Sequence, residues 1–148
     1  MTMDQDRSQR ARRLRFFAGL ALFAIFFIVA GLLHFFRPAP YWRIIPPILP
    51  WPKMLLWVSG AAEIAGGLGL LLPRFRRAAA YGLALLLVAV FPANIYMAVA
   101  HVAFPGLMGE SWAQWLRLPL QIPLIFWALH YARKRPVARL ANPTTSSN

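Results

Sequence analysis

The stretch LLWVSGAAEIAGGLGLLLP, residues Leu55–Pro73, is long and apolar enough to cross a bilayer, yet it carries an acid, Glu63, near its middle. An ionised carboxylate is costly in hydrocarbon, so an intramembrane acid indicates a functional site with a partner to be found. One face of the expected helix, at i, i+4, i+7 and i+11, consists of Ser59, Glu63, Gly66 and Leu70. Small residues let a neighbouring helix approach closely. We therefore expect this face to point into a bundle and the leucines to point to lipid.

The composition places the chain among membrane proteins. Of its 148 residues, 59% are hydrophobic and only four are acidic. The net charge of +12 raises the alternative of a nucleic-acid-binding protein, but the basic residues stand in short clusters beside apolar runs, as membrane flanks do. We therefore expect the lipid bilayer, and no nucleic acid, as a partner. The sequence has no cysteine, which excludes disulfides, thiol redox chemistry and thiolate metal ligands.

Four apolar spans follow one another along the chain. Their expected bounds are Phe16–Phe36, Leu55–Pro73, Ala78–Ala100 and Leu116–Tyr131. The fold class is therefore all-α, a bundle of four transmembrane helices. Residues 1–15 form a basic tail, residues 16–131 the membrane domain, and residues 132–148 a basic and partly disordered tail. The first apolar run is longer than the core of a signal peptide and no A-x-A cleavage site follows it, so we expect it to be retained.

Prolines interrupt several of these segments. The loop Arg37–Lys53 holds too many prolines for a continuous helix, and we expect either a stiff aromatic cap on the bundle or an ordinary connector. Pro92 removes the amide that would bond the Val88 carbonyl, and Pro119 does the same for Trp115. Broken helices beside polar residues are typical of membrane binding sites, although simple kinks are the alternative.

The basic residues of the loops set the orientation. The N-terminal tail, the second loop and the C-terminal tail carry twelve Lys and Arg residues, whereas the first and third loops carry three. Cytoplasmic loops hold the excess of Lys and Arg. We therefore expect a multi-pass membrane protein with both termini in the cytoplasm, and four spans agree with this because an even number returns the chain to its starting side.

Each of the four spans carries a polar side chain in or near the outer half of the membrane. The helical rise places His34 near the outer surface, Glu63 near mid-depth and Asn94 in the outer half. Arg117 and Gln121, four residues apart, share a face of the fourth span at a similar depth. We expect Arg117 to pair with Glu63, because pairing is how charges persist inside membranes. These five residues form our candidate ligand-binding pocket.

Each member of this pocket has a structural alternative. The Glu63–Arg117 pair can serve only to fix the helix register, Asn94 only to bond a neighbouring helix, and Arg117 only to reach the interface. His34 and His101 are the less favoured alternative of a bis-histidine haem site. The histidines do not form a metal-ligating set, and the sequence identifies no catalytic residue.

A series of short motifs carries a resemblance between about Ala30 and Tyr131. These are His34–Phe35, Pro46–Pro47, Leu49–Pro50, Val58–Gly60 with Glu63 and Gly66–Gly67, Leu71–Pro73, Phe91–Asn94 with Met97–Ala98, and Arg117–Gln121. In this order they resemble the DoxX-like family of small bacterial membrane proteins. The resemblance implies a four-helix protein of the bacterial inner membrane. Relatives in that family include the small subunit of a thiosulfate:quinone oxidoreductase and proteins needed to mature periplasmic redox enzymes.

Three functions are therefore compared. The leading one is a non-catalytic accessory subunit, linked by the resemblance to a quinone-dependent redox system, with quinone as the candidate cofactor and other membrane or periplasmic redox proteins as partners. The second is a small proton-coupled transporter, or a solute- or lipid-binding membrane protein, with Glu63 as the proton site. The third is a structural assembly factor whose polar residues only lock the helices. A homo-oligomer is compatible with all three.

Overall fold

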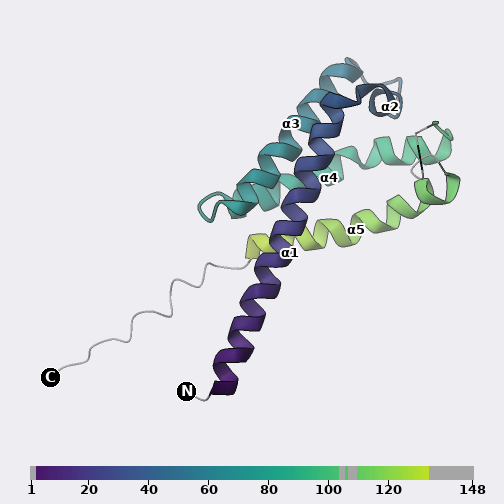
Figure 1. The fold of residues 1–148 in the computed structure, drawn as a ribbon. Helices are drawn as coiled ribbons and strands as arrows, with labels where there is room; N and C mark the ends of the chain where they lie inside the picture. The colour runs from purple at the N-terminus through teal and green to yellow at the C-terminus, as the bar shows by residue number, and fades with distance from the viewer. Residues whose placement is uncertain (1–2, 104–105, 107–109, 134–148) are drawn as a thin grey trace.

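The computed structural model describes residues 3–103, 106 and 110–133. Within these ranges the chain forms helices and no strands, which confirms the all-α prediction. The helices are α1 (Met3–Phe36), α2 (Pro38–Trp42), α3 (Pro52–Leu71), α4 (Arg76–Val99) and α5 (Ser111–Arg133), shown in Figure 1.

The first helix extends well beyond the predicted span. It begins at Met3, so the residues expected to form a polar tail are helical. No glycine or proline occurs before Gly19, and the arginines of this segment are good helix formers. Asp4 and Asp6 lie in the first turn, where negative charge stabilises the helix dipole. At the other end, α5 continues to Arg133, and the predicted disordered tail lies outside the described residues.

Three of the helices, α1, α3 and α4, are long and apolar enough to cross a membrane. The fifth is 23 residues long but is not one of these three. Its sequence contains Arg117, Gln121 and several other polar residues, which lower its mean hydropathy. The proline-rich loop holds only the short helix α2, which begins with Pro38 in the first turn, where proline is tolerated.

The long helices pack in two pairs. Helix α1 lies against α3, helix α4 lies against α5, and contacts between α3 and α4 join the pairs (Figure 1). The shared apolar core lies between the middle of α1 and the end of α5, where Phe23, Leu70, Leu83 and Tyr131 are buried. Away from this core the pairs diverge toward α2 and the connection between α4 and α5 (Figure 1).

Glycines bring α1 and α3 into close contact. A Cβ atom on Gly31 would lie 2.5 Å from the Gly60 carbonyl oxygen, and one on Gly67 would lie 2.7 Å from the Ala24 carbonyl oxygen. The prediction that the small face of residues 55–73 points inward is therefore confirmed. Leucines on the other side of α3, Leu55, Leu68 and Leu71, are exposed.

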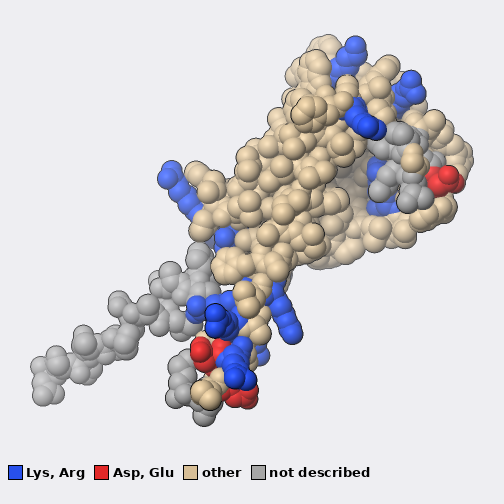
Figure 2. Space-filling view, in the orientation of Figure 1, with Lys and Arg blue, Asp and Glu red and all other residues tan. Residues whose placement is uncertain are grey.

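Charged side chains gather at the ends of the molecule. Figure 2 shows Lys and Arg around the start of α1 and, separated from them by a broad uncharged belt, near α2. Within that belt the exposed side chains are large and apolar, such as Leu22, Phe26 and Leu85. This surface is the one that a protein needs when its middle lies in hydrocarbon.

Candidate functional site

The structure distributes the five predicted pocket residues over two clusters. His34 and Glu63 lie between α1 and α3, whereas Asn94, Gln121 and Arg117 lie between α4 and α5. The division follows from the helix pairing, because each pair brings its own polar residues together. We describe the two clusters in turn.

The first cluster consists of His34, Ser59 and Glu63. The carboxylate oxygen Oε2 of Glu63 lies 3.9 Å from Nδ1 of His34, and both side chains are 12% exposed. Ser59 Oγ donates to the Leu56 carbonyl at 2.9 Å, so it is an acceptor toward His34 Nδ1, 3.4 Å away. The tautomer of His34 that carries its proton on Nδ1, on the side of Glu63, fits this arrangement.

One atom of this cluster lacks a partner. The Oε2 oxygen of Glu63 is buried and accepts no hydrogen bond among the described residues. Its separation from His34 exceeds hydrogen-bond length. Most buried polar atoms of proteins are hydrogen-bonded, so an exception points to a ligand, a water molecule or a protonated carboxyl group.

Tyr41 of α2 covers this cluster, and the sequence indicated its aromatic loop without assigning the residue to the site. Its ring meets the His34 ring edge to face, with centroids 4.5 Å apart. Burial raises the pKa of Tyr41, the positive charge of Arg117 opposes that rise, and the negative charge of Glu63 adds to it. Tyr41 is therefore within electrostatic reach of both clusters.

The second cluster is a chain of hydrogen bonds across α4 and α5. Asn94 Nδ2 donates to Gln121 Oε1 at 2.8 Å, and Gln121 Nε2 donates to the Leu87 carbonyl. Gln121 is buried. The carbonyl that it reaches is next to that of Val88, the one predicted to be freed by Pro92, although α4 continues through this proline. The amides of Asn94 and Gln121 thus use each other and the backbone, which is the interhelical role considered for Asn94.

The predicted ion pair between Glu63 and Arg117 is not present. Within the described residues, Glu63 lies beside the His34 imidazole, and Arg117 Nη1 lies 3.5 Å from the Met97 sulfur. The reason is the close approach of α1 to α3, which places His34 beside Glu63, whereas α5 packs on α4. Nor do three potential metal ligands meet anywhere in the part of the chain that the structure describes.

The Gln121 side chain should contribute measurably to stability. We expect Gln121→Leu to lower the free energy of unfolding by about 1–2 kcal/mol, because it leaves the Asn94 amide without its partner. The double variant Asn94→Leu/Gln121→Leu should lose less than the sum of the two single variants, since both partners are then apolar. Unfolding in detergent by a denaturant titration measures each value. Additive losses would contradict an interaction between the two amides.

Residues 23–132 of the chain match the family model of a domain of unknown function, DUF8561. This range includes all five predicted pocket residues. This match corrects the resemblance to the DoxX-like family. The motifs that carried the resemblance are small residues and prolines in apolar helices, and close helix packing calls for such residues in unrelated bundles as well. No curated protein and no solved structure matches the chain.

Proposed function

The chain belongs to the DUF8561 family, and from its polar clusters we propose that it is a non-catalytic integral membrane protein that binds a small polar ligand at Glu63. The observation that carries this proposal is the buried Oε2 oxygen of Glu63, which accepts no hydrogen bond among the described residues. Leaving such a group unpaired in an apolar interior costs free energy. A hydroxyl or ammonium group of a ligand would remove that cost by donating to Glu63.

The neighbours of Glu63 narrow the chemistry of the ligand. His34 Nδ1 is a donor on the same side, and the Tyr41 hydroxyl and the Arg117 guanidinium are within electrostatic reach of each other. The ligand therefore carries a hydrogen-bond donor for Glu63 and an oxygen atom that accepts from these groups. A quinol headgroup offers both a hydrogen-bond donor and an accepting oxygen. Only this hydrogen-bonding chemistry now supports a quinol, because the resemblance that suggested a redox system has been corrected.

We further propose four membrane spans, α1, α3, α4 and α5, with both termini on the cytoplasmic side of the cell membrane. In a chain that crosses the membrane four times, the start of α1, the turn between α3 and α4, and the end of α5 lie on the same side. Contacts among these three segments support that arrangement. Arg76, at the turn between α3 and α4, and Tyr131, near the end of α5, both lie against Phe16 near the start of the apolar part of α1. The excess of Lys and Arg in the segments at this end supports the cytoplasmic assignment.

Cysteine labelling tests the topology, since the natural chain has no cysteine. Ser8 and Ser111 are exposed residues at opposite ends of the proposed bundle. We expect Ser111→Cys to react with a membrane-impermeant maleimide in intact spheroplasts, and Ser8→Cys to react only after the membrane is opened. Because three proposed spans separate the two residues, labelling of both in intact spheroplasts would contradict an odd number of crossings between them, and the reverse pattern would contradict the orientation.

Replacement of Glu63 tests the ligand site. We expect Glu63→Gln to fold and to lose a small molecule that co-purifies with the natural protein, because the ligand depends on the carboxylate. Glu110→Gln is the matched control, since it makes the same chemical change at an exposed position. Mass spectrometry and thermal unfolding of the same preparations measure both properties. Proteins that co-purify identify an accessory role, and a discrete mass in multiples of the chain identifies a homo-oligomer.

The pairing of His34 with Glu63 favours proton-coupled transport as the second candidate. An imidazole and a carboxylate that lie 3.9 Å apart can each bind and release a proton, and a short movement would bring them within hydrogen-bond distance. In that case solute uptake into vesicles should depend on the proton gradient and stop in Glu63→Gln. If Glu63→Gln changes only the stability, with the bound molecules and the uptake unchanged, the structural role of an assembly factor is the better account.

A further inference from the structure

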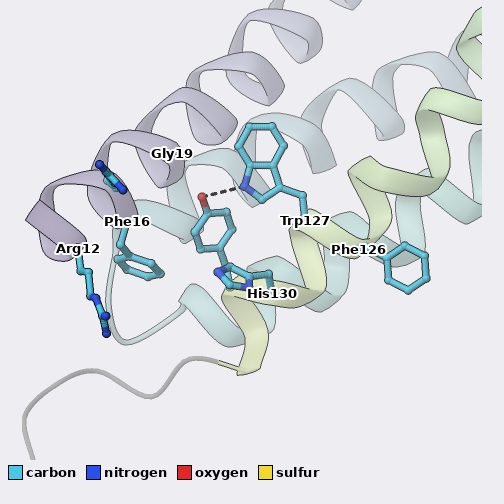
Figure 3. A pocket seen from close by; sticks show the side chains of 8 residues that line it. Arg12, Phe16, Gly19, Phe126, Trp127 and His130 are labelled. Carbon is cyan, nitrogen blue, oxygen red and sulfur yellow. Dashed lines mark hydrogen bonds between the residues drawn. The ribbon is translucent and has the colours of Figure 1, made fainter.

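A groove lies outside both polar clusters, between the start of α1 and the end of α5. Its volume is about 660 Å³, and it is lined by Arg12, Arg15, Phe16 and Gly19 from α1 and by Phe126, Trp127, His130 and Tyr131 from α5. Figure 3 shows the side chains of these two helices on either side of the space. The α1 wall thus carries two arginines, and the α5 wall is mainly aromatic.

Gly19 brings α1 close to the end of α5, and the groove opens beside this contact. A Cβ atom on Gly19 would lie 2.9 Å from the Tyr131 hydroxyl oxygen. On the N-terminal side of Gly19, α1 continues past the core, and Arg12 and Arg15 are exposed there. The apolar run of α1 begins directly after Arg15, so the groove lies at the boundary between the charged end and the uncharged belt.

Within the described residues, no acid balances the positive charge of this groove. Neither Arg12 nor Arg15 lies within ion-pair distance of an Asp or Glu there, where the one such contact found joins Glu63 to His34. The sequence after Arg133 adds further Lys and Arg residues and no Asp or Glu. A groove with this charge selects an anion, and its apolar wall selects one that carries hydrocarbon.

The aromatic wall also offers a directed donor. Trp127 Nε1 donates to the Tyr131 hydroxyl oxygen at 2.9 Å, as the dashed line in Figure 3 shows. The hydroxyl hydrogen of Tyr131 has no acceptor among the described residues, and is free to donate to a phosphate oxygen. Beside it, Phe126 is 67% exposed and extends the apolar surface along α5.

We propose that this groove binds one anionic phospholipid of the cytoplasmic leaflet. Its phosphate lies between Arg12 and Arg15 and accepts from the Tyr131 hydroxyl, and its acyl chains run along Trp127 and Phe126. Basic pockets beside membrane helices on the cytoplasmic side bind anionic headgroups in this way. The site is separate from the Glu63 cluster, so the failure of the ligand proposal leaves it intact, whereas its place in the cytoplasmic leaflet rests on the orientation proposed above.

Lipid retention in native mass spectrometry tests the proposal, with phosphatidylglycerol and phosphatidylcholine supplied in the same mixed micelles. The natural protein should retain one phosphatidylglycerol in preference to phosphatidylcholine, and Arg12→Gln/Arg15→Gln should lower that preference by about tenfold or more. The control is Arg10→Gln/Arg13→Gln, which removes the same charge from exposed positions outside the groove and should keep the preference. Equal losses in both double variants would overturn the site.

Two further measurements distinguish a lipid site from a site for soluble anions and test the position of the phosphate. Glycerol phosphate, added as the headgroup without acyl chains, should not displace the lipid, and displacement at millimolar concentration would overturn the proposal in favour of a soluble-anion site. Tyr131→Phe, which removes the hydroxyl and leaves both arginines, should weaken retention by about threefold. If Tyr131→Phe leaves retention unchanged, the placement of the phosphate is wrong.

Discussion

Gly60→Leu is expected to separate α1 from α3 and to lower the free energy of unfolding by about 3 kcal/mol or more. A Cβ atom at this position would lie 2.8 Å from the His34 Cβ atom and 3.0 Å from the Gly31 carbonyl oxygen. The backbone oxygen cannot rotate away as a flexible side chain can, so the whole helix has to shift. The measurement is unfolding in detergent, followed by circular dichroism.

Gly82→Leu provides the control for this change. Gly82 also lies within a long apolar helix, but a Cβ atom there would meet nothing within 4 Å. The same substitution should therefore leave stability unchanged or raise it slightly, because glycine is a poor helix former. Similar losses for both variants would show that the close approach of α1 to α3 does not determine the effect.

Arg76→Met is expected to cost about 2 kcal/mol, although arginine is normally a surface residue. The Arg76 side chain is buried, and its Nε donates to the Leu70 carbonyl at 2.9 Å. That carbonyl belongs to the last turn of α3, where backbone oxygens lack partners within the helix and a positive charge is favourable. The guanidinium also lies 5.8 Å from the centre of the Phe16 ring.

Arg77→Met is the matched control, because Arg77 belongs to the same basic turn but is exposed. It should change stability by less than about 0.5 kcal/mol. Equal effects of the two substitutions would mean that the loss comes from net charge and not from the capping of α3. Both are measured by the same denaturant titration.

Much of the fold follows from local sequence. The apolar runs locate the long helices, and the spacing of Ser59, Glu63 and Gly66 identifies the buried face of α3, because these features depend on helical periodicity alone. The start of α1 was placed too late, since hydropathy marks the membrane boundary and not the end of a helix. The arginines before Phe16 favour a helix as strongly as the apolar residues after it.

The candidate site depends on which helices pack together, and this the sequence does not determine. The predicted depth of Glu63 in the membrane indicated that its carboxylate needs a partner. Arg117 and His34 were both predicted at depths from which they could reach it. The choice between them depends on the contact of Gly31 with Gly60, a relation between two distant segments. Asn94 and Gln121 were assigned to the predicted ligand pocket, with an interhelical hydrogen bond as the alternative for Asn94, because a sequence cannot show that two amides satisfy each other.

The position of the apolar core has a mechanical consequence. All four long helices meet in the core near the basic end, whereas toward α2 the two helix pairs are arms that extend from it (Figure 1). Two arms joined at one end can rotate about that junction at little cost in buried apolar area. Such a rotation changes the separation of Glu63, on one arm, from Arg117, on the other, and Tyr41 is the side chain that senses both charges. The core is therefore the point about which such a rotation would turn, and the rotation would move the Glu63 cluster relative to Arg117.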